Sequence, residues 1–271
     1  ESVAEAFRSH REFAEITLYL QQFGINADYA MKLYRVYGAD TIAAVQENPY
    51  RLAEDLFGVG FKKADKIAEK MGIARDDEHR IKSGIKYTLN YFAGEGNTFL
   101  PQNVLCEKAG GMLELEREKI SDCLVEMAFQ GDVHIENLEN RNVVFLMPYY
   151  LAEQNVCKCM AAINSARLRP VGSDMDSLIA VTEQDTGIRL SENQKYAVKT
   201  SLNQGVSVIT GGPGTGKTTI INTMIRILQH SGLKTAIAAP TGRAAKRITE
   251  TSGYEASTIH RLLEYYYSEG E

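Results

Sequence analysis

The sequence predicts a multidomain protein that is mainly α-helical and ends in an α/β segment with parallel strands. Three observations lead to this fold class. The pattern of residues 1–75 predicts short helices joined by tight glycine turns. The pattern of residues 81–146 predicts three helices followed by a β-hairpin, and that of residues 206–249 predicts strands that alternate with helices. We therefore expect a helix-hairpin-helix domain, a winged-helix-like module and an incomplete α/β domain, in this order.

The composition is that of a soluble globular protein, with 44% hydrophobic and 24% charged residues among 271. No apolar run approaches the roughly 20 residues that a membrane span needs, so we expect no membrane partner and a cytoplasmic location. The first residue is Glu1 rather than Met, which suggests an excised or processed piece. The formal net charge of −5 argues mildly against a nucleic-acid binder, so any DNA contact must come from local basic clusters.

The cysteines do not form a recognisable metal site. Cys157 and Cys159 are one residue too close for a zinc-type CxxC pair, and neither Cys106 nor Cys123 belongs to a second pair. We expect reduced thiols on amphipathic helices and no metal bound by cysteine, as is usual in a reducing cytosol.

Residues 1–75 are predicted to form a tandem helix-hairpin-helix domain. Gly58-Val59-Gly60 precedes a helix that begins with Lys62 and Lys63, and two glycines permit a turn tight enough for backbone N–H groups to approach a DNA phosphate. Residues 23–38 look like a degenerate partner hairpin. Gly58, Gly60, Lys62 and Lys63 are thus candidate contacts to duplex or junction DNA, whereas a plain tight turn or a protein-docking hairpin remains an alternative.

Residues 76–150 are predicted to form the winged-helix-like module. Helices are expected around Ile81–Phe92, Pro101–Ala109 and Glu114–Gln130, and a hairpin from Val133 to Leu146 with a polar turn at residues 137–142. Residues 151–188 are assigned to a connecting helix and a linker. Residues 189–271 then form an incomplete domain with strands at 206–210 and 235–239, each followed by a helix.

The most specific motif is the phosphate-binding loop at residues 211–218, which fits G-x-x-x-x-G-K-[ST] at every fixed position. Its backbone N–H groups and the following helix N-terminus favour an anion, Lys217 can reach the β- and γ-phosphates of ATP, and Thr218 can ligate Mg²⁺. We predict catalytic roles for Lys217 and Thr218, with Thr218 as the metal ligand. The nucleotide-binding residues of this segment are Gly212, Pro213, Gly214, Thr215, Gly216, Lys217, Thr218 and Thr219.

Hydrolysis needs more than this loop. Phosphoryl transfer also requires a carboxylate beside the metal, a residue that orients the attacking water and usually an arginine finger. No strand ending in Asp-Glu follows Lys217 in this sequence. We therefore expect the chain by itself to bind ATP and Mg²⁺ but to be nearly inactive as a hydrolase.

Three further segments resemble the RecD-like DNA helicases of superfamily 1, of the bacterial long-form RecD-like/TraA branch. Residues 190–195 resemble the glutamine motif, residues 239–247 resemble motif Ia, and residues 256–263 are similar to the segment that follows it. Residues 47–53 and the hairpin after them also recur in the longer bacterial members. The likeness thus covers nearly the whole chain.

The resemblance implies an ATP-dependent DNA helicase that moves 5′ to 3′, with a first RecA-like motor domain at residues 189–271. It implies that Gln194 recognises adenine and that Thr241, Arg243 and Thr258 contact single-stranded DNA. Members of this family continue through a Walker B motif and a second RecA-like domain with the arginine finger. DNA repair and recombination are the implied processes, and the resemblance indicates no particular protein partner.

Other interpretations stay open at this point. The chain could act as a DNA-binding or docking module without motor activity, or belong to another P-loop ATPase class. Arg243, Lys246 and Arg247 could be a solvated basic helix face. Tyr265, Tyr266 and Tyr267 could stack on bases, although packing against protein is the commoner role of such a cluster.

Overall fold

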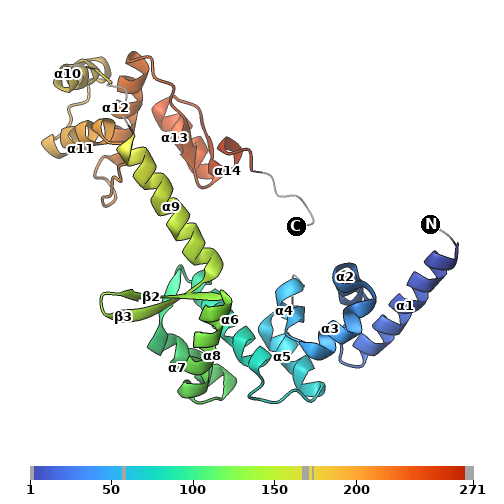
Figure 1. Cartoon of the computed structure of the whole chain (residues 1–271). Coiled ribbons are helices and arrows are strands. Elements are labelled where there is room, and N and C mark those ends of the chain that lie inside the picture. Colours follow the sequence, from blue (N-terminus) through green and yellow to red (C-terminus); the bar gives the residue numbers. More distant parts are fainter. Residues whose placement is uncertain (1–2, 57–58, 167–170, 173, 266–271) are drawn as a thin grey trace. The chain divides into compact units, whose positions relative to one another are not determined.

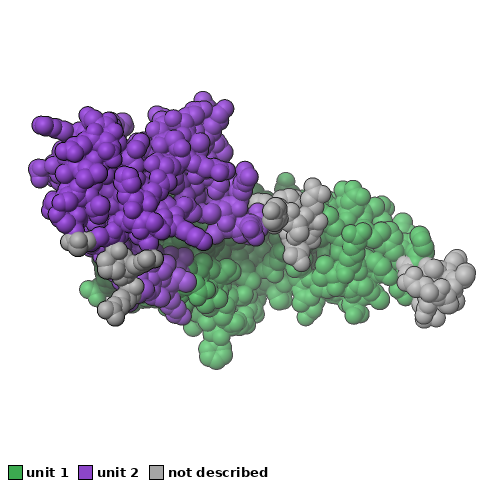
Figure 2. Space-filling model, turned by 90° about the horizontal axis from the view of Figure 1, so that it is seen from above, with its two compact units in different colours: residues 1–155 green, residues 156–271 purple. Residues whose placement is uncertain are grey.

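A computed structural model of the chain describes residues 3–56, 59–166, 171–172 and 174–265 (Figure 1). Contacts divide it into two compact units, unit 1 at residues 1–155 and unit 2 at residues 156–271, which Figure 2 colours separately. Both units agree with the predicted fold class, since helices dominate and the parallel strands lie near the C-terminal end. Within the described ranges, no helix is both long enough and apolar enough to cross a bilayer.

Unit 1 begins with one long helix, α1 (Val3–Gln21), after which shorter helices follow as the glycine spacing predicts. α1 and α2 (Ala27–Tyr37) flank a turn in which Gly24 has a φ of +83°, and the side chain of Asn26 caps α2. A 3-10 turn, η1 (Gly38–Asp40), and α3 (Thr41–Glu47) follow. The second hairpin joins α4 (Arg51–Asp55) to α5 (Phe61–Lys70).

The rest of unit 1 has the arrangement of a winged helix. It contains α6 (Glu78–Gly94), β1 (Phe99–Pro101), α7 (Gln102–Leu113), α8 (Arg117–Gln130), β2 (Val133–Leu138) and β3 (Arg141–Leu146). The strands form one antiparallel sheet in the order β1-β3-β2. The sequence pattern did not reveal β1, because three residues are too few to show an alternating period.

The β2–β3 hairpin is tighter than predicted. Strand pairing continues to Leu138 and Arg141, so the loop consists of Glu139 and Asn140 alone. Both residues have positive φ, at 51° and 63°, which is the geometry of a type I′ two-residue turn. The expected turn at residues 137–142 was too long, because Asn137 and Asn142 pair across the strands instead of forming the loop.

One apolar core runs through unit 1 without a break at the predicted boundary between residues 75 and 76. Val59 and Phe61 from the second hairpin belong to the same buried cluster as Ile85 of α6 and Leu124 of α8. The acidic run at this boundary has a local role, because the side chain of Asp77 caps α6 by accepting from the N–H groups of His79 and Arg80. The three predicted domain boundaries remain predictions.

A polar clamp joins the hairpin segment to the winged helix. The guanidinium of Arg80 donates from Nε to Asp65 Oδ1 at 2.8 Å and from Nη2 to Asp65 Oδ2 at 3.1 Å. Its Nη1 donates to the carbonyl oxygen of Leu113 at 3.0 Å, and Tyr50 Oη donates to Asp65 Oδ1 at 2.7 Å. Because Asp65 lies on α5 and Arg80 on α6, these bonds fix α5 against the module that follows.

Long helix α9 (Met147–Ser165) follows β3 and has no buried residue among those described. Unit 2 contains α10 (Met175–Thr186), α11 (Glu192–Asn203), α12 (Lys217–His230), β4 (Ile237–Ala239), α13 (Gly242–Ser252), β5 (Ala256–Thr258) and α14 (Ile259–Leu262). Within residues 151–188, which were assigned to a connecting helix and a linker, α10 is a second helix that the sequence pattern did not reveal.

The parallel strands of unit 2 differ from the expected pair. β4 pairs with β5, with Ala239 opposite Thr258, whereas residues 206–210 form no strand. A strand needs a neighbour that accepts and donates its backbone hydrogen bonds, and no described segment pairs with residues 206–210. Val208 is accordingly 80% exposed. The strand predicted there was wrong for the described residues, although the parallel α/β character was right.

Candidate functional site

The phosphate-binding loop lies directly before α12, as its motif requires. Gly214 and Gly216 have φ values of +76° and +84°, a region that favours glycine over any side chain. Thr215 Oγ1 donates to the carbonyl oxygen of Gly212 at 2.9 Å and so braces the loop from within. Gly212, Pro213 and Gly214 are exposed, as is Thr218 in the first turn of α12.

The side chain of Lys217 folds back onto the phosphate-binding loop. Its Nζ donates to the carbonyl oxygens of Gly211 at 2.5 Å and of Gly212 at 2.7 Å. The ammonium group is therefore held at the mouth of the loop, and a phosphate oxygen would compete with these neutral carbonyls for the same protons. A phosphate oxygen carries a full negative charge whereas a carbonyl oxygen carries only a partial one, so the ammonium group binds the phosphate more strongly and the exchange favours the anion.

Gln194 contacts the loop through its side-chain amide. Its Oε1 accepts from the N–H of Ser191 at 2.9 Å while Ser191 Oγ caps α11, and its Nε2 donates to the carbonyl oxygen of Thr215 at 3.3 Å. An amide has two donor hydrogens and two acceptor lone pairs. One donor and one acceptor thus remain for the edge of an adenine base.

The fit between Gln194 and the loop depends on a glycine. A Cβ built on Gly216 would lie 2.2 Å from Gln194 Nε2, far inside a normal contact. Glu183 of α10 supports α11 from the other side, because its Oε1 accepts from the N–H of Leu190 at 2.7 Å and its Oε2 lies 3.6 Å from Lys195 Nζ. No sequence motif pointed to Glu183, since its partners are set by the packing of α10 and α11 against α12.

The predicted DNA contacts of unit 2 come together at one edge of the β4–β5 sheet. Thr258 ends β5 and Thr241 follows β4 by two residues, so both lie where the parallel strands end. Thr241 Oγ1 accepts from the N–H of Ala244, capping α13, and Thr258 Oγ1 accepts from the N–H of Arg261, capping α14. Each hydroxyl keeps its own hydrogen for an external acceptor such as a phosphate oxygen. Arg243 is exposed in the first turn of α13.

The two hairpins of unit 1 contact each other near their turns. Ile25 and Val59 are buried anchors at equivalent positions, each one residue after a glycine. Lys63 Nζ of the second hairpin lies 4.5 Å from the ring centroid of Tyr29 in the first, and Lys32 Nζ lies 5.8 Å from the same ring. When Gly24-Ile25-Asn26 is aligned with Gly58-Val59-Gly60, Tyr29 and Lys63 occupy equivalent positions. This correspondence is a sequence signal for the contact between the two hairpins.

Gly60 and the lysines after it lie at the surface of the second hairpin. Gly60 is the N-cap of α5, and a Cβ there would meet no atom within 4 Å. The protein's own packing therefore gives no reason for glycine at this position. Lys62, Lys63 and Lys66 are exposed on α5. Gly58, the other predicted contact, lies outside the described residues.

The remaining candidates have ordinary surroundings. All four cysteines are free, and burial raises the pKa of the Cys123 thiol to about 11, which keeps it protonated at neutral pH. Within the described ranges, no three metal-ligating side chains gather at one point. Tyr265 stacks edge-on with His260 at 6.0 Å between centroids, whereas Tyr266 and Tyr267 lie outside the described residues.

Comparison with known proteins gives matches to two segments of the chain. Residues 9–99 match the family model described as the ATP-dependent RecD2 DNA helicase HHH domain, and residues 194–271 match an AAA domain model. The chain is 28% identical over 91% of its length to the ATP-dependent RecD2 DNA helicase of Deinococcus radiodurans, spanning 35% of that protein. It is 34% identical to the RecBCD enzyme subunit RecD of Mycolicibacterium smegmatis, over 45% of the chain and 25% of the relative.

A shorter stretch, 27% of the chain, is 40% identical to the ATP-dependent DNA helicase dda of Enterobacteria phage T4 and covers 18% of that protein. The chain thus spans about a third or less of the length of each of these relatives. The hairpin domain and the nucleotide-binding domain occur in the predicted order, and one relative matches both. The chain is therefore similar to the RecD-like DNA helicases over nearly its whole length.

Proposed function

We propose that this chain supplies ATP binding and DNA binding to an ATP-dependent DNA helicase that moves 5′ to 3′. The observation that carries the proposal is the contact between Gln194 and the phosphate-binding loop, with Lys217 held over the same loop. Base recognition and phosphate binding are thereby brought to one place in a chain that also carries paired DNA-binding-type hairpins. Its expected setting is DNA repair or recombination in the cytoplasm.

At the nucleotide, each residue has a separate task. The loop from Gly212 to Gly216 offers backbone N–H groups to the β-phosphate, and Lys217 neutralises the β- and γ-phosphates. Thr218 and Thr219 lie in the first turn of α12. Thr218 presents its hydroxyl to the Mg²⁺ that accompanies ATP. Gln194 uses its remaining donor and acceptor to distinguish adenine from guanine.

At the DNA, unit 2 holds a single strand and unit 1 holds duplex or junction DNA. Thr241 and Thr258 donate hydroxyl hydrogens to phosphates at two helix N-termini, and Arg243 adds a charge. In unit 1, Gly60 allows close backbone approach, and Lys62 and Lys63 neutralise phosphates. These contacts are independent of base sequence, as a translocating enzyme requires.

Nucleotide binding is tested by titrating a fluorescent ATP analogue with Mg²⁺. Lys217→Ala should weaken binding by about ten- to a hundredfold, since it removes a charge-assisted bond worth about 1.5–3 kcal/mol. Gln194→Glu preserves the capping box but removes the amide donor, so it should reduce the preference for ATP over GTP. Asn193→Ala, one residue away, is the control. Unchanged binding in Lys217→Ala would reject the proposed nucleotide site.

DNA binding is tested separately by titrating duplex and single-stranded oligonucleotides at several salt concentrations. Gly60→Ala should leave the thermal stability of unit 1 nearly unchanged and weaken duplex binding, because the added Cβ meets DNA and not protein. Arg243→Ala should weaken single-strand binding. Loss of DNA binding in Lys63→Ala with no effect of Arg243→Ala or Lys217→Ala would instead favour a docking module without motor activity.

A further inference from the structure

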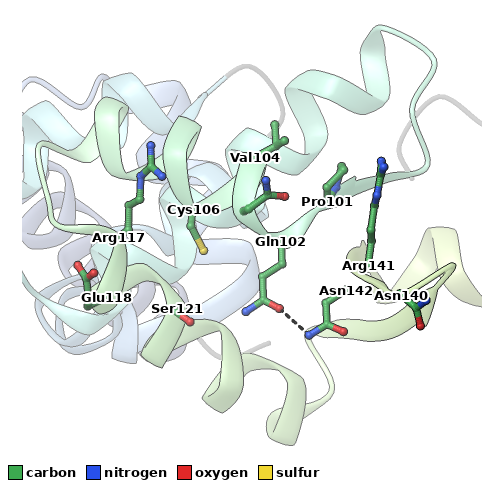
Figure 3. A pocket seen from close by; sticks show the side chains of 11 residues that line it. Pro101, Gln102, Val104, Cys106, Arg117, Glu118, Ser121, Asn140, Arg141 and Asn142 are labelled. Atoms are coloured by element: carbon green, nitrogen blue, oxygen red, sulfur yellow. Dashed lines mark hydrogen bonds between the residues drawn. The ribbon is translucent and has the colours of Figure 1, made fainter.

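The winged helix of unit 1 has a polar groove that the proposed sites leave unused. It has a volume of about 750 Å³, within the usual range of ligand-binding clefts. Figure 3 shows that its walls come from three elements: the start of α7, the start of α8 and the turn between β2 and β3. These elements are far apart in the sequence and meet only in the folded module.

Two amide side chains of the lining, Gln102 and Asn142, form a hydrogen-bonded row with the neighbouring Asn137. Asn137 Nδ2 donates to Asn142 Oδ1 at 2.9 Å, and Asn142 Nδ2 donates to Gln102 Oε1 at 3.3 Å. Each amide retains further hydrogen-bonding capacity, so the row can bind phosphate or sugar oxygens. The second bond is the dashed line in Figure 3.

Two arginines line the groove in a chain whose net charge is −5. Arg141 is exposed at the first position of β3, and no ion pair is recorded for it among the described residues. Arg117 begins α8 and pairs with Glu107 at 3.0 Å, with 63% of its side chain still exposed. Glu118 is the one acid in the lining. Cations combined with amides are the set that binds a sugar–phosphate backbone.

Backbone donors at the groove are also available. The N-cap residues of α7 and α8 are Pro101 and Glu116, and neither makes a side-chain cap hydrogen bond. Helices elsewhere in unit 1, such as α2 and α6, are capped by Asn26 and Asp77. The first N–H groups of both α7 and α8 can therefore donate to an oxygen bound in the groove.

The outer face of α8 does not suit the major groove of DNA. In helix-turn-helix proteins the second helix of the pair enters that groove. Here the exposed face of α8 carries Glu118, Asp122 and Glu126, together with Val125 and Phe129. Carboxylates on this face of α8 would repel the phosphates on both sides of the major groove of DNA. The cationic contacts are confined to the helix start and the hairpin turn.

We propose that this groove binds the sugar–phosphate backbone of duplex DNA, with Arg141 and Arg117 pairing phosphates while α8 stays outside the major groove. The proposal rests on the DNA-binding function proposed above and adds a third contact to it. The type I′ turn at Glu139 and Asn140 fixes the hairpin that presents Arg141, so little ordering accompanies binding. Binding at this groove is independent of base sequence.

The first test measures binding of the full 271-residue chain to a fluorescein-labelled 20-base-pair duplex by anisotropy. Arg141→Ala should weaken binding about three- to tenfold and reduce the slope of log affinity against log salt by about 1, the value for one lost phosphate contact. Glu118→Gln should tighten binding about two- to threefold, since it removes a repulsive charge. Arg75→Ala removes an exposed arginine outside the groove and should change binding less than twofold.

The second test locates the DNA by cross-linking. A photo-reactive group is attached to Asn140→Cys or to Val125→Cys, each in a background of Cys157→Ser and Cys159→Ser. Cross-links to duplex from position 140 and not from position 125 support the proposal. Cross-links from position 125 alone, or an Arg141→Ala effect on single strands but not on duplex, would overturn it.

The outcome is separable from that of the proposed function. Repeating both tests in a Lys62→Ala, Lys63→Ala background removes the hairpin contribution, and the Arg141→Ala effect should persist. If Lys63→Ala and Lys217→Ala weaken their ligands while Arg141→Ala, Glu118→Gln and the cross-links show no effect, the groove proposal fails and the helicase function stands.

Discussion

Unit 1 and unit 2 differ in how much of their structure is held by a core of their own. In unit 1 the buried cluster extends from Ile16 in α1 to Leu146 in β3 and contains large side chains such as Tyr50 and Leu124. In unit 2 the cluster consists, among the described residues, of Ile179, Leu190, Val198, Ile220 and Ile227. The two units therefore bury very different amounts of apolar surface for segments of similar order in length.

The difference follows what each unit is proposed to do. The hairpins and the winged helix need a rigid support, because they present fixed turns to a stiff duplex. The nucleotide site consists of an exposed loop, and such loops have low local stability. A bound nucleotide stabilises its own domain by mass action, so ligand binding supplements the small core of unit 2. Four predictions test this contrast, beginning with the largest effect.

Matched core truncations should give unequal losses. Leu124 and Ile227 are both fully buried. Leu124→Ala should lower the free energy of unfolding of unit 1 by about 3–4 kcal/mol, and Ile227→Ala should lower that of unit 2 by about 2 kcal/mol, because the sparser surroundings collapse more readily around the cavity. Hydrogen exchange measured by mass spectrometry resolves the two units within one chain. Equal losses would mean that the cores are equally well packed.

The clamp between the hairpin segment and the winged helix should matter almost as much. Arg80→Ala leaves the Asp65 carboxylate partly buried without its charged partner and should lower the stability of unit 1 by about 2–3 kcal/mol. Arg75→Ala breaks an exposed pair with Glu114 and should cost about 0–1 kcal/mol. Urea denaturation measures both. If Arg80→Ala destabilised α5 but left α6 to α8 unchanged, the hairpins and the winged helix would be separate folding units.

In unit 2 two glycine substitutions should distinguish effects on nucleotide binding from effects on the stability of the unbound protein. Gly216→Ala combines a positive φ with a contact of 2.2 Å to Gln194, so it should destabilise unit 2 by about 1–2 kcal/mol and abolish stabilisation by ATP and Mg²⁺. A Cβ on Gly212 meets no atom within 4 Å, so Gly212→Ala should leave the stability of the unbound protein unchanged. Thermal denaturation with and without nucleotide measures the contrast. A stable Gly216→Ala variant would show that Gln194 moves away freely.

The smallest expected effect depends on pH. Burial, and then the hydrogen bond to Asp65, raise the pKa of Tyr50 well above its ordinary value of 10.0. In the unfolded chain Tyr50 ionises near pH 10, whereas in the folded chain its phenol stays neutral. The contribution of Tyr50 to the free energy of unfolding is therefore fully present below pH 10 and declines above it. Tyr50→Phe should cost about 1 kcal/mol at pH 8. Denaturation at pH 8 and at about pH 11 should show that the difference in stability between the unsubstituted chain and Tyr50→Phe is smaller at the higher pH. An equal difference at both pH values would place the phenol in a solvent-like environment.

Much of the fold could be predicted because its signals are local. Glycines and prolines end helices, apolar residues at helical spacing mark α2, α5 and α8, and the alternating residues on either side of Asn140 mark the hairpin. The phosphate-binding loop was equally accessible, because positive φ at Gly214 and Gly216 and the position of Lys217 are properties of one short segment.

Features that depend on partners distant in the sequence could not be predicted. Residues 206–210 have strand-forming composition, but strand formation needs a neighbouring strand, and β4 pairs with β5 instead. Glu183 carries no motif and acquires its role when α10 and α11 both pack against α12, which brings its carboxylate to the N–H of Leu190. The groove of the winged helix likewise joins Gln102, Arg117 and Arg141, which share no sequence pattern.

The sequence by itself determined the order of the modules, the nucleotide loop and the presence, though not the length, of the β2–β3 turn, because each is specified by backbone preferences within about ten residues. Tertiary structure decided that Arg80 joins two of these modules into one unit, that Gln194 contacts the loop, and which strands pair. The physical reason is that hydrogen bonds and burial between distant segments depend on which surfaces meet after folding, and local propensity does not encode that choice.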